Sequence, residues 1–408
     1  MKGIVFNASV PKYLTTMILG AIRQDFYHAP FSCVALKEIE APALPGNNWV
    51  KIKTLYGGIC GTDLNMILLR DSPSISPFVS FPFVIGHENV GVIVEKGADV
   101  QQFKIGDRVA ADPLLSCDAR EISPLCPNCA KGHYSVCENI TRPPLSPGIS
   151  IGFCKDTGGS WGEYYVAHQS HLFKIPESVT DQEAVLLDPI CSALHPVMNH
   201  FPEAHEKILI VGCGVIGLLI IGCLRALDSQ CDITVMAKYP FQGNLAKKMG
   251  ADRVIYAQKT DYFDQFKDIT HGALYQPMLG KRVMLGGFDK VFDCVGSSGT
   301  IDESLKFTRA KGTMVLVGLA NYPKKVDWTP VWFKELNITG SMYYNTERYQ
   351  DGRQEKAFQI ALDLLHRKKL GVQPLVTHTF KIDDYRQALQ TAVDKRRHES
   401  LKVLFKFE

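Results

Sequence analysis

The sequence predicts an α/β protein of two domains, a β-rich domain and a domain built on a doubly wound parallel sheet. The chain has 408 residues, which exceeds one ordinary hydrophobic core, so two domains are expected. Short apolar runs separated by glycine turns occupy residues 49–176, a pattern typical of a barrel-like β domain. Between residues 208 and 317, strand-like runs alternate with helix-like segments, which indicates βαβ units and a parallel sheet.

The first part of the chain carries several separate strand signals. Residues 3–6 form a short apolar run, and residues 49–55 alternate apolar and polar side chains, as a half-buried strand does. Further strand-like runs follow at 83–85, 90–94 and 161–166. Because these runs are short and bounded by glycine, we expect them to build the β-rich domain.

The alternating part begins near residue 180. A helix is predicted at 181–187 with Thr180 as its N-cap, and another helix at 218–227. Toward the end of the chain, an amphipathic helix is predicted at 355–365 and a final strand at 401–405. The strands of the parallel sheet are predicted, in order, at 208–211, 233–236, 254–256, 291–294 and 314–317.

Some segments do not fit this simple plan. Leu14, Ile18 and Ile22 mark an amphipathic segment to which we assign no role, and residues 269–288 are interpreted as an insertion between two strands. Three further stretches are insertions or long loops that we expect to shape any substrate pocket: 70–82, 117–126 and 142–159.

A glycine-rich turn follows the first strand of the alternating part. The strand runs directly into Gly212-x-Gly214-x-x-Gly217, and a predicted helix comes next. In this context the first glycine forms a tight turn, the second lets backbone approach a pyrophosphate and the third lets the helix pack on the strand. Free N–H groups at the start of the helix favour phosphate. The sequence therefore predicts a dinucleotide-binding turn, and the alternative is a glycine-rich turn of an unrelated α/β domain.

Composition narrows the classes of partner. The chain is 46% hydrophobic and 21% charged, with a formal net charge of +3. This mild balance argues against binding to nucleic acid or to a membrane surface. No secretory signal or long apolar span is evident, so we expect a cytoplasmic protein that acts on a small molecule.

Four of the twelve cysteines lie close together in the sequence. Cys117, Cys126, Cys129 and Cys137 fall within 21 residues, and the other cysteines are scattered. Four thiolates are the number that a tetrahedral structural zinc requires, and the two-residue gap lets one turn deliver two sulfurs. We therefore predict a structural zinc site, against the alternative of four buried free cysteines.

A second group of metal-binding residue types lies at the ends of two predicted strands. Cys60 follows the first of these strands, and His87 with Glu88 follows the second. A thiolate, an imidazole and a carboxylate can hold Zn²⁺ with one open position for a catalytic water or substrate. Taken alone, a single cysteine and a single histidine are more often ordinary core residues.

Several motifs together resemble the zinc-dependent medium-chain alcohol dehydrogenase family. The resemblance rests on GICGTD at 58–63, GHENVGVIVEKG at 86–97, FKIGDRVA at 103–110, the cysteine cluster and IVGCGVIG at 210–217. It implies a GroES-like domain at 1–178, to which residues 329–408 return, and a Rossmann domain at 179–328. It also implies one catalytic and one structural zinc, and a homodimer or homotetramer.

The resemblance implies a set of ligands for the catalytic zinc. Cys60 and His87 match the family's first two ligands. Asp188 is the candidate for the third ligand because an acid before a proline is similar to the polyol and sugar dehydrogenase branch, and Cys191 is its competitor. Glu88 is either a ligand or a group that enters during ligand exchange.

The resemblance also implies a mechanism. The zinc lowers the pKa of a substrate hydroxyl, and a hydride passes between the carbinol carbon and a nicotinamide. Thr62 matches the family's proton-relay hydroxyl, and Asp63 is expected to hold His87 rather than to act as a base. Asn65 stands where many relatives continue the relay with histidine, and asparagine cannot titrate, which leaves the exit path of the proton open.

The cofactor site is expected around the glycine turn. NAD enzymes place an acid at the end of the second Rossmann strand, but Ala237 and Lys238 stand there in this chain. A lysine without a neighbouring carboxylate favours a 2′-phosphate, so NADP is favoured over NAD. The residues predicted to contact the cofactor are Gly212, Gly214, Val215, Ile216, Gly217, Ala237, Lys238, Val295, Val317 and Leu319.

These expectations combine into one predicted function and two alternatives. The chain is expected to oxidise a secondary alcohol, polyol or sugar-like alcohol to its ketone, or to run the reverse reaction, with Trp161 and Phe78 as candidates for the pocket wall. A zinc-free quinone or enoyl reductase of the same superfamily would lack the Cys60 and His87 pair. The second alternative is a non-catalytic relative that acts as a binding protein.

Overall fold

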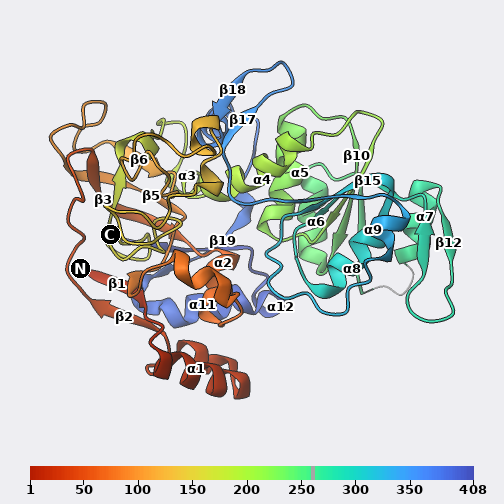
Figure 1. Cartoon of the computed structure of the whole chain (residues 1–408), viewed down its shortest axis with the longest axis horizontal. Coiled ribbons are helices and arrows are strands. Elements are labelled where there is room, and N and C mark those ends of the chain that lie inside the picture. Colours follow the sequence, from red (N-terminus) through yellow and green to blue (C-terminus); the bar gives the residue numbers. More distant parts are fainter. Residues whose placement is uncertain (259–261) are drawn as a thin grey trace.

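The computed structural model describes residues 1–258 and 262–408. Figure 1 shows a β-rich part that contains both chain termini, and beside it a part in which helices surround a parallel sheet. The predicted α/β class, with one β-rich and one doubly wound domain, is confirmed. No helix within these described ranges is both long and apolar enough to cross a membrane.

The β-rich part is organised around β3 (Trp49–Gly58), the strand predicted from alternation. Val50, Ile52 and Thr54 are fully buried on one face, while residues between them are half-buried. The main sheet has the order β19-β20-β3-β5-β6-β8, and β7 also pairs with β3. Its other strands are β5 (Asn89–Lys96), β6 (Arg108–Ala111), β7 (Tyr164–His168), β8 (Leu172–Lys174), β19 (Val376–Lys381) and β20 (Lys402–Lys406).

A smaller sheet lies at the start of the chain. It has the order β2-β1-β4, with β1 (Lys2–Phe6) between β2 (Val34–Glu38) and β4 (Phe83–Val84). Phe6 pairs directly with Val34, although residues 7–33 separate them. These intervening residues contain the amphipathic helix α1 (Val10–Ile22), whose Leu14, Ile18 and Ile22 are exposed. The helix extends away from the sheet (Figure 1).

The second part is a six-stranded parallel sheet with the order β11-β10-β9-β14-β15-β16. All five predicted strands are present, although β15 begins six residues before the predicted 314. The last strand lies beyond residue 328, outside the range predicted for this domain. The strands are β9 (Lys207–Val211), β10 (Asp232–Ala237), β11 (Arg253–Tyr256), β14 (Phe288–Asp293), β15 (Thr308–Leu316) and β16 (Asn337–Gly340).

Helices connect and cover these strands. Thr180 caps α3 as predicted, since its hydroxyl accepts the Glu183 N–H while the Glu183 carboxylate accepts the Thr180 N–H. The α-helices are α2 (Gly61–Ile67), α3 (Asp181–Ala184), α4 (Leu187–Asn199), α5 (Val215–Ala226), α6 (Pro240–Lys248), α7 (Tyr262–Thr270), α8 (Ser298–Phe307), α9 (Thr329–Phe333), α10 (Ala357–His366), α11 (Tyr385–Val393) and α12 (Lys395–His398).

The largest hydrophobic core joins the two parts of the molecule. It contains the fully buried side chains of α4 and α5 together with those of the central strands β9 and β10. Helix α10 packs against α4, so the C-terminal part of the chain is anchored on the helix that precedes the parallel sheet. This shared core fixes the β-rich part against the glycine turn after β9.

Short elements complete the chain. The predicted insertion at 269–288 forms a hairpin in which Met278 and Leu279 are almost fully exposed. The two hairpins are β12 (Ala273–Tyr275) with β13 (Val283–Leu285), and β17 (Thr346–Arg348) with β18 (Gln354–Lys356). The 3₁₀ helices are η1 (Gln24–His28), η2 (Pro73–Phe78), η3 (Cys129–Lys131), η4 (Tyr134–Val136), η5 (Gln169–His171), η6 (Gln373–Leu375) and η7 (Ile382–Asp384).

Candidate active site and metal centres

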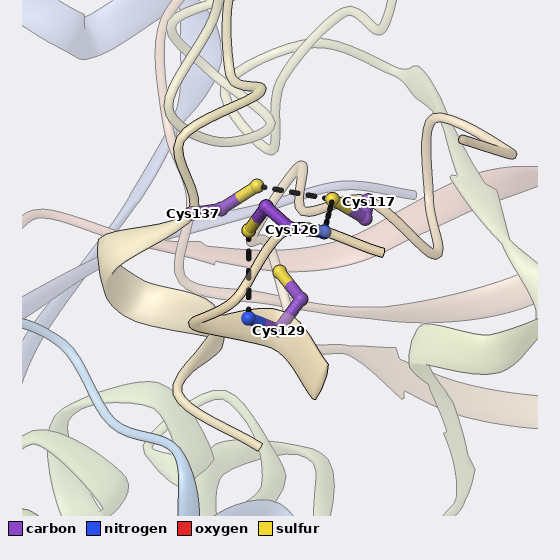
Figure 2. A group of neighbouring side chains, drawn as sticks. All are labelled: Cys117, Cys126, Cys129 and Cys137. Atoms are coloured by element: carbon purple, nitrogen blue, oxygen red, sulfur yellow. Dashed lines mark hydrogen bonds between the residues drawn. The ribbon is translucent and has the colours of Figure 1, made fainter. Parts of the chain in front are cut away.

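The four clustered cysteines converge on one point. Figure 2 shows Cys117, Cys126, Cys129 and Cys137 with their side chains directed toward one another. All four are buried, and their sulfur atoms lie within 4.8 Å of one another. The sulfurs of Cys117 and Cys137 are 3.6 Å apart. In a tetrahedral site with Zn–S bonds of about 2.3 Å, the sulfurs are separated by roughly 3.8 Å, so this arrangement fits a zinc ion.

Backbone and side-chain N–H groups point at these sulfurs. The Cys126 N–H donates to the sulfur of Cys117 at 3.4 Å, and the Cys129 N–H donates to that of Cys126 at 3.5 Å. The Asn139 side chain donates to Cys117 at 3.2 Å. Such donors stabilise negative charge on sulfur, as a site of four thiolates requires. With all four positions taken by protein, the site would have a structural role.

The second metal-type group contains Cys60, His87 and Glu88, whose ligand atoms also lie within 4.8 Å of one another. Cys60 is the N-cap of α2, and its own N–H donates to Asp63 at 2.9 Å. The other carboxylate oxygen of Asp63 is 3.4 Å from Nδ1 of His87. Neither of these two facing atoms has a hydrogen-bond partner, although both are buried. This contact is the arrangement expected of a carboxylate that orients a metal-binding imidazole.

Glu88 has a partner that the sequence did not indicate. Its carboxylate oxygens lie 2.5 Å and 2.7 Å from Nζ of Lys402, and both side chains are buried. Gly58 makes room for this pair, since a Cβ there would lie 1.9 Å from the Glu88 carboxylate. The Lys402 ammonium balances the charge of Glu88, so a metal bound by Glu88 would have to compete with this ion pair.

Asp188 lies in the first turn of α4 and lines the same cavity as Cys60 and His87. Its carboxylate accepts the O–H of Tyr344 at 2.8 Å, and burial raises its pKa to about 6. It is not part of the group of three ligand atoms, so its assignment as the third ligand stays a prediction. Its competitor Cys191 is fully buried and does not line the cavity.

Two tyrosines lie near the group of Cys60, His87 and Glu88 but were not predicted from the sequence. Tyr343 lines the cavity, its ring centre is 6.2 Å from that of His87, and its hydroxyl is hydrogen-bonded to Ser150 at 3.1 Å. Burial raises the pKa of Tyr343 to about 12. Tyr344 binds Asp188, as described above. Both lie in an irregular segment without a motif, so no sequence signal marks them.

Thr62, the predicted relay hydroxyl, lies close to Cys60. It is in the first turn of α2, and its oxygen is 3.6 Å from the sulfur of Cys60. Thr62 and Asn65 both line the cavity. The predicted relay hydroxyl therefore faces the same space as the metal-type group.

The three glycines of the turn after β9 have three different environments. Gly212 has a φ of +97°, a conformation that other residues rarely adopt. A Cβ on Gly217 would lie 1.9 Å from the carbonyl oxygen of Gly212. Helix α5 can therefore pack this closely against the turn only because residue 217 is glycine. A Cβ on Gly214 would meet nothing within 4 Å. The backbone at Gly214 is thus open to a ligand, and α5 begins immediately after it with free N–H groups.

The end of β10 lies next to this turn. Met236 pairs with Val211, so Ala237 and Lys238 follow at the carboxyl edge of the sheet. Ala237 is fully buried, whereas Lys238 is exposed, with its ammonium 5.4 Å from the ring centre of Tyr239. No carboxylate occurs at positions 237–239, so the strand end carries a positive charge alone.

One cavity of about 710 Å³ lies between the group of Cys60 and His87 and the parallel-sheet part, and Gly212, Gly214, Val215, Gly217, Ala237 and Lys238 are not among its lining residues. Its wall includes Cys60, Thr62 and His87 from the β-rich part. From the parallel-sheet part it includes Ile216, Val295, Val317 and Leu319. Strand ends on both sides of the point where the strand order reverses meet here, the usual position of a ligand in such sheets.

Of the two residues predicted to line the pocket, Phe78 and Trp161, only one does so. Phe78 lines the cavity as predicted. Trp161 does not, and that prediction is wrong. Its indole N–H donates to the carbonyl of Gly58 at 2.8 Å, and its ring packs on Phe405 in the core. A buried tryptophan needs a partner for its N–H, and a strand carbonyl supplies it here.

The fold and the site together define an oxidoreductase of the two-domain dehydrogenase class. The family model described as "Alcohol dehydrogenase GroES-like domain" matches residues 46–177, and that described as "Zinc-binding dehydrogenase" matches residues 215–367. Together the two matches cover more than half of the chain. The chain belongs to the zinc-type medium-chain dehydrogenase family.

Individual relatives agree with this assignment. The chain is 29% identical over 372 residues to L-threonine 3-dehydrogenase of Paraburkholderia xenovorans (strain LB400), covering 91% of this chain and 95% of the relative. An Escherichia coli oxidoreductase of unknown specificity matches with a TM-score of 0.74 and 23% identity over 92% of this chain and 96% of its own. Acetophenone reductase of Geotrichum candidum matches with a TM-score of 0.74 and 22% identity over 100% and 97%. At these identities the two solved structures show the fold alone.

Proposed function

We propose that this chain is a zinc-dependent oxidoreductase that transfers a hydride between NADP(H) or NAD(H) and a secondary alcohol or its ketone. One observation carries this proposal. The Cys60 and His87 pair lines the same cavity as Ile216 beside the glycine turn and Val295 and Val317 at the strand ends, which supports a cofactor and a metal meeting there. This arrangement also disfavours a zinc-free reductase, which has no use for a paired thiol and imidazole.

The proposed zinc ligands are Cys60 and His87, with Asp188 or Glu88 as the third. A zinc bound here would supply Lewis acidity toward an oxygen of the substrate. Asp63 holds the imidazole of His87 in place, and Tyr344 holds the carboxylate of Asp188. A second zinc is proposed for the four-cysteine cluster, where it would stabilise the fold.

Proton movement is assigned to Thr62. Its hydroxyl faces the cavity and accepts the proton that an alcohol loses on oxidation. Asn65 beside it cannot titrate, so the proton leaves Thr62 through solvent or another group rather than through a histidine. A Thr62→Val variant is therefore expected to lower kcat.

For the cofactor we propose a preference for NADP. The N–H groups after Gly214 would bind the pyrophosphate, and Lys238 would offer a counter-charge to a 2′-phosphate without competition from a carboxylate. Val295, Val317 and Leu319 line the cavity and would contact the nicotinamide. Asp293 stabilises this edge, because its carboxylate accepts the N–H groups of Val295 and Gly296 at 2.9 Å and 3.0 Å.

The division of the chain follows from sheet membership. We propose a catalytic domain at 1–178 with a returning C-terminal part, as in the prediction. Because β16 pairs with β15, the cofactor domain is proposed to extend to Gly340 rather than to end at 328. A homodimer or homotetramer in the cytoplasm completes the proposal, and light scattering of the purified protein measures the assembly.

The test uses the purified full chain. Zinc is measured by mass spectrometry, and reduction of NADP⁺ and NAD⁺ is followed with a panel of secondary alcohols. We expect two zincs per chain and turnover of at least one alcohol. Cys60→Ser should lower kcat/KM by roughly 1000-fold with one zinc lost, while Cys33→Ser, at a buried cysteine outside both clusters, should not. Fewer than two zincs, or no turnover of any alcohol or ketone, contradicts the proposal.

A further inference from the structure

A row of aromatic rings extends from His87 to the mouth of the cavity. The ring centre of Phe153 is 5.8 Å from that of His87 and 5.6 Å from that of Phe83. The ring centre of Phe83 is in turn 5.7 Å from that of Phe6 and 5.6 Å from that of Phe81. All four phenylalanines line the cavity, and Phe81 is the outermost, with 38% of its surface exposed. One wall of the cavity is therefore a continuous apolar surface that begins beside a proposed zinc ligand.

Apolar side chains from helix α1 and from the predicted insertion at 70–82 also line the cavity. Tyr13 comes from α1, and Ile75 and Phe78 come from the 3₁₀ helix η2. Met66 and Leu69, at the end of α2 and just beyond it, also line the cavity. A substrate that reaches from the metal-type group toward the mouth is thus in contact with carbon on several sides, which favours an apolar substituent.

Anionic substrates find no cationic side chain along this cavity. Among the described residues that line it, none is a lysine or an arginine. Its acids are Asp71, whose pKa is raised to about 6 by burial, and Asp188, which is occupied by Tyr344. A carboxylate or phosphate on the substrate would therefore be desolvated without a counter-charge, at a cost to binding.

Three of the hydroxyl and amide groups that line the cavity donate hydrogen bonds within the protein. Ser72 donates to the hydroxyl of Tyr322 at 3.2 Å. Ser76 donates to a backbone carbonyl at 2.7 Å, and the amide of Asn321 donates to another at 2.9 Å. A polyol would compete with these bonds for the donated hydrogens, whereas an apolar substituent would leave them in place.

We propose that the substrate is a secondary alcohol with a large apolar substituent, aryl or long alkyl, or the corresponding ketone. This proposal rests on the proposed function and narrows its secondary alcohols to apolar ones, in place of the polyol or sugar-like alcohols expected from the sequence. In the oxidative direction the carbinol carbon gives its hydride to the oxidised nicotinamide, and the hydroxyl proton leaves by way of Thr62. The products are the ketone, the reduced nicotinamide and one proton.

The first test compares substrates of graded size with the purified holoenzyme. The series is 2-propanol, 2-butanol, 2-hexanol, 2-octanol and 1-phenylethanol, with sorbitol and L-threonine as polar comparisons. We expect kcat/KM to rise roughly fourfold per methylene until the cavity is filled. Sorbitol and L-threonine should fall at least about 100-fold below 2-octanol.

A matched pair of variants then locates the effect. Phe81 and Phe31 are both 38% exposed, but only Phe81 lines the cavity. Phe81→Ser should lower kcat/KM for 2-octanol about tenfold and leave 2-propanol within twofold. Phe31→Ser should change neither. Because both residues are partly exposed, both variants are expected to fold, and circular dichroism checks this.

The outcomes separate the two proposals. Turnover of small alcohols with a flat dependence on chain length, or faster turnover of sorbitol or L-threonine, overturns the apolar substrate and leaves the dehydrogenase standing. An equal effect of Phe81→Ser on small and large alcohols also overturns it. No turnover of any alcohol or ketone in the series overturns both.

Discussion

The ammonium of Lys402 lies 2.5 Å from the carboxylate of Glu88, although 314 residues separate them in the sequence. Strand β20 pairs with β3 and brings Lys402 beneath the group formed by Cys60, His87 and Glu88. The C-terminal strand therefore sets the charge at the proposed metal centre. It also ties that centre to the C-terminal strand of the β-rich sheet.

Removing Lys402 should be costly. Lys402→Met leaves a buried carboxylate without its partner, and we expect unfolding free energy to fall by about 3–5 kcal/mol in chemical denaturation. Lys406→Met, on the same strand but exposed, should change it by less than about 0.5 kcal/mol. The double variant Lys402→Met with Glu88→Gln should recover part of the loss. Equal stability of the two single variants would contradict the prediction.

Arg120 is a second buried cation, and its partners are all backbone carbonyls. Its guanidinium donates to the carbonyls of five residues: Leu115, Arg142, Leu145, Ser146 and Gly148. Arg120→Lys cannot reproduce this fork of donors, so we expect a loss of about 2–4 kcal/mol. The measurement is urea unfolding, with Arg142→Lys, an exposed side chain, as the control. A loss of unfolding free energy below about 1 kcal/mol would show that the segment 142–148 does not depend on the Arg120 hydrogen bonds.

The four-cysteine cluster should hold one zinc independently of the catalytic site. Cys129→Ser is expected to remove about one zinc per chain and to lower thermal stability. Cys223→Ser, at a buried cysteine far from any metal-type group, should keep both zincs. Mass spectrometry under native conditions counts the ions, and an unchanged count in Cys129→Ser would refute the site.

Cofactor preference should depend on Lys238. Ala237 is fully buried, so an acid there would test packing as much as cofactor choice, and Lys238 is the better position. Lys238→Glu should shift the ratio of kcat/KM for NADP to that for NAD at least tenfold toward NAD. Lys247→Glu on α6 is the control. If the ratio does not move in Lys238→Glu, the 2′-phosphate does not contact this residue.

His168 gives a pH dependence of stability. Burial, with the nearby His171, lowers its pKa to about 4, against the opposing influence of Glu121 and Asp118. Below pH 6.5 the unfolded chain binds a proton that the folded chain does not accept until about pH 4, so stability decreases as pH falls through this window. His168→Gln should lose less stability between pH 7 and pH 5 than the wild type. Identical losses in urea unfolding would argue that another group is responsible.

Local patterns predicted most of the elements and much of the site. Alternation located β3, the glycine spacing located the turn after β9, and the spacing of four cysteines predicted their convergence. Each of these signals lies within a short stretch of sequence. Residues that meet through long-range pairing left no such signal.

Lys402 and Tyr344 illustrate what could not be predicted. Lys402 reaches Glu88 only because β20 joins β3, and Tyr344 reaches Asp188 across a gap of 156 residues. The periodicity of individual strands does not predict their order in a sheet. The prediction that Trp161 lines the pocket was wrong for a related reason. The position of its ring depends on its packing against Phe405, which is distant in the sequence.

Phe6 pairs with Val34, so the chain leaves the small sheet before residues 7–33, which contain helix α1, and re-enters it at one point. The length of this segment can therefore change without shifting the strand register. Lengthening such an excursion costs little, because loop-closure entropy grows slowly with length. Exchange of this segment between homologues is therefore a route by which substrate range can diverge, and be engineered by chimeras, on an unaltered catalytic framework.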